Sequence, residues 1–145
     1  MDKPAEFEKR LYQFYRFLYV KMEAATAEIL SREGLTVIQL RILAELEMTG
    51  GSSVGDLGVR LGMNTGNCSS ACKRMEARGL LCRTRLREDE RIVRVALSPE
   101  GAAALRRVFQ HLHERQASAL SRLTQEEQDT LIDGMDRMEA YLKQF

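Results

Sequence analysis

The sequence predicts a mainly α-helical protein with one small β-ribbon. Apolar residues recur three or four positions apart, the helical period, along most of the 145 residues. Small polar residues precede several of these segments and glycine follows them, as expected at helix starts and stops. Between Leu81 and Leu97 the period changes to two, which is typical of β-strands.

The first helix is predicted from Pro4 to about Arg32, with Gly34 ending it. Its apolar residues form two stripes. The second stripe is aromatic and contains Tyr12, Tyr15 and Tyr19. The apolar surface of a helix with two such stripes is larger than one core contact can cover. We therefore expect this helix to pack against a second copy of the chain as well.

Three shorter helices are predicted next. A capping box of Thr36 and Gln39 starts the first, which extends over 36–48. The second covers 53–62 and the third covers 64–79, each with a capping side chain at its start and glycine at its end. Two helices joined by so short a turn predict a helix-turn-helix.

A β-hairpin is predicted after the third of these helices. Its strands cover 81–86 and 91–97, and the acidic residues 88–90 form its turn. Along the first strand, arginines alternate with Cys82 and other residues, so we expect the ribbon to project its arginines. A short third strand is expected near 52–54.

Two helices complete the chain. Ser98 followed by Pro99 starts one, and a second capping box, Thr124 with Glu127, starts the other. The resulting order predicts a winged helix-turn-helix core with a small β-wing, flanked by N- and C-terminal helices that serve dimerisation.

Composition excludes several classes of protein. Hydrophobic residues make up 44% and charged residues 30%, which is ordinary for a globular domain. We expect no membrane span and no signal peptide, because no apolar run approaches about 18 residues. The three cysteines are therefore expected as free thiols in a reducing cytoplasm. With no phosphate loop, nucleophile elbow or paired-carboxylate signature, neither an enzyme nor a bound cofactor is expected.

The net charge of +1 hides an uneven distribution. Between Arg60 and Arg94 lie nine basic and four acidic residues, so this segment carries +5 and the rest of the chain −4. Such a concentration of arginine is typical of a surface that neutralises nucleic-acid phosphates.

The helix after the turn has the composition of a DNA-reading helix. If Cys68, Cys72 and Met75 face inward, small hydrogen-bonding residues occupy the opposite face, which suits the major groove. The arginines of the hairpin suit a minor groove or a row of phosphates, and Asp89 is placed to hold the Arg91 side chain extended. The residues predicted to contact DNA are Asn64, Thr65, Asn67, Ser69, Ser70, Lys73, Arg74, Arg83, Arg85, Arg87, Asp89 and Arg91.

Several short stretches carry a resemblance to a known family. They are LTVIQLRIL at 35–43, VGDL at 54–57, GLL at 79–81, and DER at 89–91 followed by LSPEG at 97–101. In these residues the chain resembles the MarR family of bacterial winged-helix transcriptional regulators. The most specific part of the resemblance is the wing signature, in which Asp-x-Arg is followed by Leu-Ser-x-x-Gly. The resemblance covers residues from about 30 to about 105.

The resemblance implies a homodimer built from the terminal helices, 1–34 and 99–145, around a DNA-binding region at 35–98. Each subunit would place its reading helix in half of a palindromic operator in double-stranded DNA, with Arg91 in the minor groove, and the dimer would repress transcription. The sequence departs from the family pattern at Ser70, often an arginine, and at Cys68, often a branched apolar residue. Both departures affect which bases are read.

Three kinds of regulation are considered. A small aromatic or anionic effector is the first, with Tyr12, Tyr15, Tyr19 and Arg41 as candidate wall residues. A redox switch is the second, because Cys68 and Cys72 lie four apart on one helix face and Cys68 is near the helix N-terminus, which lowers a thiol pKa. The alternative is that both cysteines, which occupy inward positions, are small hydrophobic core residues. Metal regulation is the third. No Cys/His spacing resembles a zinc site, so no metal is expected.

The remaining alternative is a helical adapter dimer that does not bind DNA. The +5 segment argues against it, since an adapter has no need of that concentration of arginine.

Overall fold

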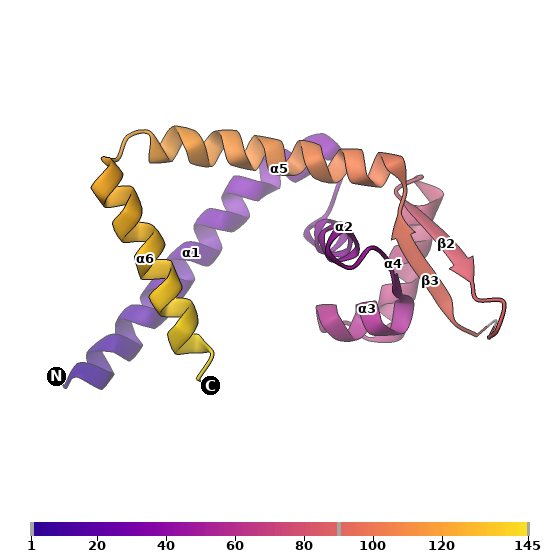
Figure 1. Ribbon diagram of the computed structural model, residues 1–145, viewed down its shortest axis with the longest axis horizontal. Helices are drawn as coiled ribbons and strands as arrows, with labels where there is room; N and C mark the ends of the chain where they lie inside the picture. Colours follow the sequence, from indigo (N-terminus) through magenta and orange to yellow (C-terminus); the bar gives the residue numbers. More distant parts are fainter. Residues whose placement is uncertain (1, 90, 145) are drawn as a thin grey trace. The chain divides into compact units, whose positions relative to one another are not determined.

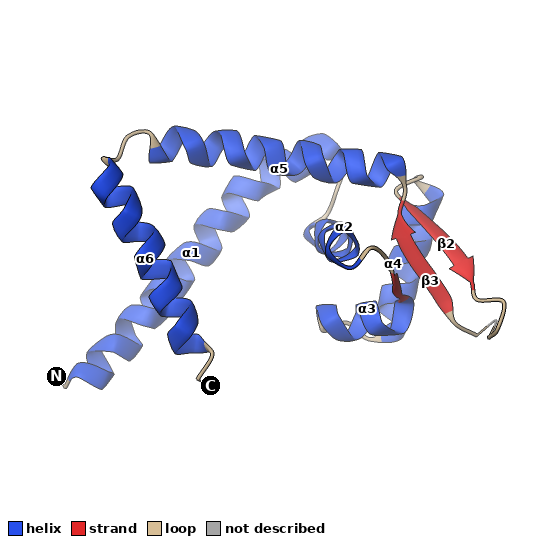
Figure 2. Cartoon of the chain, viewed as in Figure 1, coloured by secondary structure: helices blue, strands red, loops and turns tan. Residues whose placement is uncertain are grey.

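The computed structural model describes residues 2–89 and 91–144, and the predicted polar turn at 88–90 therefore lies partly outside the described residues. The mainly helical fold with a small sheet is confirmed (Figures 1 and 2). In chain order the elements are α1 (Lys3–Glu33), α2 (Val37–Thr49), β1 (Ser52–Ser53), α3 (Val54–Leu61), α4 (Thr65–Ala77), β2 (Leu81–Arg85), β3 (Val93–Leu97), α5 (Pro99–Leu120) and α6 (Gln125–Leu142).

The helix starts follow the capping residues of the sequence. Thr36 and Thr124 both form the predicted capping boxes, and Ser53 and Asn64 cap α3 and α4 with their side chains. Asp2, which was not predicted as a cap, accepts from the backbone N–H of Ala5 and starts α1.

The strands form a three-stranded antiparallel sheet in the order β1-β3-β2. Arg83 of β2 lies opposite Val95 of β3, and Ser52 of β1 pairs with Val95 from the other side. The third strand is therefore present but shorter than the predicted 52–54, because Val54 already begins α3.

The hydrophobic core lies between α2, α3, α4, the sheet and the first turns of α5. Its largest fully buried side chains come from all of these elements and are Ile42, Leu43, Leu46, Leu57, Met75, Val95 and Val108. Because these side chains pack in one core, α3 and α4 are held against the sheet. This packing fixes the positions of the exposed faces of α4 and the hairpin.

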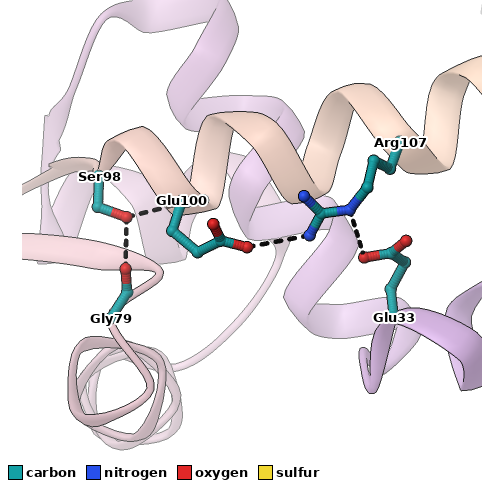
Figure 3. A network of polar contacts seen from close by, with 6 residues as sticks. Glu33, Gly79, Ser98, Glu100 and Arg107 are labelled. Carbon is teal, nitrogen blue, oxygen red and sulfur yellow. Dashed lines mark hydrogen bonds and ion pairs between the residues drawn. The ribbon is translucent and has the colours of Figure 1, made fainter.

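The hairpin is anchored where it meets α5 (Figure 3). The Ser98 hydroxyl donates to the Gly79 carbonyl (2.5 Å) and accepts from the backbone N–H of Gly101 (2.9 Å). A Cβ on Gly101 would lie 2.0 Å from the Leu80 carbonyl oxygen, so α5 approaches this closely only because the position is glycine. The LSPEG stretch therefore has a structural role at the base of the hairpin.

An ion-pair bridge also joins α1 to α5 (Figure 3). Arg107 donates through Nε to Glu33 (2.9 Å) and through Nη2 to Glu100 (3.0 Å). The end of α1 is thus held against the first turns of α5, beside the base of the hairpin.

The chain divides into two compact units, 1–109 and 110–145, with the boundary inside α5. In the first unit, α1 buries only Ile29 and Leu30 among its described residues, and Tyr12, Tyr15 and Phe17 are 62–63% exposed. In the second unit α6 exposes a row of apolar side chains: Leu131, Ile132, Met135 and Leu142. No helix in the described parts of the chain is long and apolar enough to cross a membrane.

Candidate nucleic-acid interface

The helix α4, called the reading helix below, has one buried and one polar face. Cys68, Cys72 and Met75 are completely buried, as the sequence predicted. The opposite face exposes Thr65, Asn67, Ser70, Lys73 and Arg74, with Ser69 half-buried at its edge. This face is long enough and free enough of large apolar side chains to enter a major groove.

The start of the reading helix is organised by its cap. The Asn64 side-chain oxygen accepts from the backbone N–H of Asn67 at 2.8 Å, so the predicted DNA contact at Asn64 is left to its amide NH₂ group. The first turn also carries the partial positive charge of a helix N-terminus, which attracts phosphate oxygens.

The wing, residues 81–97 of the hairpin, lies beside the reading helix (Figure 1). One groove is lined by Thr65 and Ser69 of α4, Ser53 at the start of α3, and Arg91 and Val93 of the wing. The exposed Arg91 thus lies next to the first two turns of the reading helix. Arg85 and Arg87 are exposed on the same ribbon. The structure therefore brings Arg91 together with Thr65 and Ser69, whereas Asn67, Ser70 and Arg74 line a second groove between α4 and α2.

Arg83 departs from the expectation that the ribbon projects its arginines. Its side chain is 17% exposed and donates to Glu76 of the reading helix at 3.1 Å. The reason is the pleat of β2: Arg83 shares a face with the buried Leu81, and that face is turned towards α4.

The predicted contact between the Asp89 and Arg91 side chains is replaced by a backbone contact. The Asp89 carboxylate accepts from the backbone N–H of Arg91 at 3.0 Å. Such a bond closes a tight turn, so Asp89 shapes the tip of the wing and leaves the Arg91 guanidinium exposed.

The four candidate effector residues do not converge. Tyr15 and Tyr19, with ring centroids 6.4 Å apart, line one groove of α1, whereas Tyr12 lines another. Arg41 instead donates to the carbonyl of Leu61 at the end of α3 (3.1 Å). Of this set, Tyr15 and Tyr19 therefore line one groove together, and Tyr12 and Arg41 lie elsewhere.

Cys68 and Cys72, the candidate redox pair, are both completely buried. Burial raises the pKa of Cys68, and burial together with the neighbouring Cys68 raises the pKa of Cys72 to about 12. The expectation of a lowered pKa at Cys68 is wrong, because burial is the largest cause of its shift and raises the pKa. Cys82 is exposed.

We predict that iodoacetamide at pH 8 alkylates Cys82 well before Cys68 or Cys72. A pKa of about 12 leaves roughly one Cys72 thiol in ten thousand ionised at pH 8, and that fraction rises tenfold per pH unit. Mass spectrometry of tryptic peptides gives the order of labelling, and a Cys82→Ser variant should lose the fast phase. Equal rates at all three cysteines would contradict the burial of this pair.

The described histidines and carboxylates were considered as a metal site. Within residues 2–89 and 91–144, no group of three or more His, Cys, Asp or Glu side chains is arranged to hold a metal ion.

Two contacts of the interface were missed from the sequence. Glu76 binds Arg83, and Arg78 at the end of α4 donates to Gln39 of α2 at 3.4 Å. Glu76 and Arg83 lie on different elements, so no helical or strand period links them. The available signal was the presence of the acidic Glu76 in a strongly basic segment, which suggests an ion pair with a basic residue of the same chain.

Comparisons with known proteins find similarity to one family. Residues 33–92 match the sequence model of the MarR family. The HTH-type transcriptional repressor MdtR of Bacillus subtilis (strain 168) is 28% identical over 110 residues, which span 76% of this chain and 71% of MdtR. Among solved structures, a MarR family protein from Bacillus stearothermophilus matches with a TM-score of 0.85 at 23% identity, over 99% of each chain. A mutant of S. aureus MepR bound to an oligodeoxyribonucleotide matches with a TM-score of 0.69 at 19% identity, over 91% of this chain and 97% of that one.

Proposed function

We propose that this chain, whose residues 33–92 match the MarR family, is a winged-helix transcriptional regulator of that family, binds a palindromic operator in double-stranded DNA as a homodimer and represses transcription there. One observation carries the proposal. Thr65 and Ser69 in the first turns of the reading helix border one groove with the exposed Arg91 of the wing, and the elements that carry them pack on a well-buried core.

In the proposed complex, the reading helix enters the major groove. Asn67 and Ser70 face base edges, while Lys73 and Arg74 neutralise phosphates. The wing follows the backbone with Arg85 and Arg87, and Arg91 enters the adjacent minor groove, where a guanidinium is attracted by the negative potential.

The homodimer is supported by the apolar surface of the terminal helices. In the first unit α1 exposes Phe7, Phe14 and Phe17, none of which lines the groove of Tyr15 and Tyr19, and in the second unit α6 exposes Leu131, Ile132 and Met135. Apolar surface of this extent on a regulator is typical of a subunit interface. Two copies would set the two reading helices roughly 34 Å apart, one turn of DNA, and so would read a palindrome.

Repression is proposed from the similarity to MdtR, a transcriptional repressor, together with the polar and basic surface of α4 and the wing. Release by a small aromatic effector is proposed at the groove of α1 that Tyr15, Tyr19, Met22 and Val37 line. A cytoplasmic location follows from the proposed DNA target.

Selection of bound sequences from a random duplex pool tests the proposal. Enrichment of a palindrome with half-sites one turn apart is the expected result, because the dimer axis imposes its symmetry on the site. In a gel shift, binding should weaken steeply with salt, since each neutralised phosphate releases counterions. A protein that binds no duplex at low salt would be the helical adapter instead.

We predict that Asn67→Ala changes sequence preference more than overall affinity. The Asn67 side chain is exposed on the first turn of the reading helix, where an amide pairs with adenine in the major groove. Discrimination at one base pair of each half-site should fall by about 1–3 kcal/mol. Repeating the selection with the variant measures this, and a uniform loss across all duplexes would place Asn67 on the backbone.

A further inference from the structure

The contact between Glu76 of the reading helix and Arg83 of β2 lies outside the proposed DNA contacts. Arg83 Nη1 lies 3.1 Å from Glu76 Oε2, and the two side chains are 17% and 41% exposed. The Arg83 Nε atom is buried and has no hydrogen-bond partner among the described residues. A guanidinium this far from solvent needs its counter-charge, so Arg83 is committed to the protein rather than available to phosphate.

We propose that Arg83 is a positioning residue: its ion pair with Glu76 holds the wing at the angle to the reading helix at which Arg91 and the helix reach the same duplex. This inference rests on the proposed DNA-binding function. It assigns a role in recognition to two residues that do not touch DNA.

The geometry of the ribbon explains why such a link is needed. At its base the ribbon is anchored by Ser98 and by the backbone bond from Ser98 to Leu80. Arg83 is the middle residue of β2, and its bond to Glu76 ties the strand to α4 beyond that base. With a rise of about 3.3 Å per residue, a rotation of about 10° at the base moves side chains six residues along by roughly 3 Å. That displacement is enough to break a hydrogen bond.

The sign of the charge change makes the proposal testable. Glu76 shares its groove with Lys73, Arg83 and Arg85, and it is the acidic residue there. If the surface acted only through its electrostatic field, neutralising Glu76 would tighten DNA binding. If the ion pair positions the wing, the same neutralisation weakens binding.

The experiment compares Glu76→Gln with wild type, using a duplex that carries the sequence recovered by the selection. We expect the apparent Kd to rise about tenfold, with helical content by circular dichroism unchanged. Glu88→Gln is the matched control, because Glu88 is an exposed acid of the wing. It should bind as tightly as wild type or more tightly. Arg83→Lys, which keeps the charge and a donor, should retain most of the affinity.

Every outcome of the Glu76→Gln measurement decides the inference. Tighter DNA binding by Glu76→Gln would show that the released Arg83 binds phosphate. Unchanged binding would show that the ion pair does not contribute to DNA affinity. Either result overturns the proposal. In an Arg91→Ala background, Glu76→Gln should change the Kd less than twofold, because the pair acts through the wing. An undiminished effect there would indicate a general structural role and would also overturn it.

A DNA-free measurement separates this inference from the proposed function. Amide hydrogen exchange in β2 and β3 should accelerate in Glu76→Gln but not in Glu88→Gln. If wild type binds no duplex, the proposed function fails, while accelerated exchange would still show that the pair holds the ribbon. Unchanged exchange would overturn the positioning role directly.

Discussion

Gly101→Ala is expected to lower the free energy of unfolding by at least about 3 kcal/mol, the largest stability loss predicted for a single methyl group in this chain. The added Cβ would lie 2.0 Å from the Leu80 carbonyl oxygen and 3.4 Å from a Leu43 methyl carbon. Because the first contact is with backbone, relief requires α5 to move away from the base of the wing. That movement would also strain the bonds that Ser98 makes to Gly79 and Gly101.

Urea unfolding at one fixed protein concentration measures the loss, since a dimer's apparent stability depends on concentration. Gly66→Ala is the matched control: its Cβ would meet only the Asn64 side-chain oxygen, at an ordinary 3.5 Å. In that exposed helical position alanine should leave the unfolding free energy unchanged or raise it by up to about 1 kcal/mol. Equal stability of Gly101→Ala and wild type would mean that α5 does not pack against Leu80 as described.

Arg91→Ala is expected to weaken binding to the proposed operator by about 10- to 100-fold while leaving the proposed dimer intact. Arg91 is exposed beside the first turns of the reading helix, and its backbone N–H is held by Asp89. Alanine removes the guanidinium proposed to enter the minor groove, and the turn keeps its backbone bond. Fluorescence anisotropy at constant salt measures the affinity, and analytical ultracentrifugation measures the dimer.

Arg122→Ala controls for the loss of one positive charge. Arg122 is exposed in the turn between α5 and α6, in the second compact unit, and it should change the Kd by less than about twofold. If Arg91→Ala binds as tightly as wild type, the wing tip has no role in recognition. If the dimer dissociates, Arg91 acts on assembly and not on DNA.

Much of the site was predictable because its signals are local. The cap at Asn64 and the buried positions of Cys68, Cys72 and Met75 follow from the helical period and from capping chemistry within a few residues. Arg91 was predicted from the Asp-x-Arg pattern, and its exposure agrees. Residues close in the sequence determine these features, so they can be predicted without the tertiary structure.

The errors arose where a choice depends on a distant element. A period of two in β2 shows that its faces differ, but not which face meets α4, and the structure turns Arg83 inward with Leu81. Likewise Cys68 lies near a helix N-terminus in any fold, but the packing of the core decides that burial raises its pKa. Arg41 was separated from the tyrosines because its side chain reaches the end of α3.

By itself, the sequence determined the order of the helices and the ribbon, the caps of α2, α3, α4 and α6, and the resemblance to the MarR family, because each depends on short-range periodicity, capping or motif. Only the tertiary structure decided which arginines are exposed, which one pairs with Glu76, and why residue 101 is glycine. Those properties depend on how α4, α5 and the ribbon pack against one another, and packing is set by the shapes and charges of residues far apart in the chain.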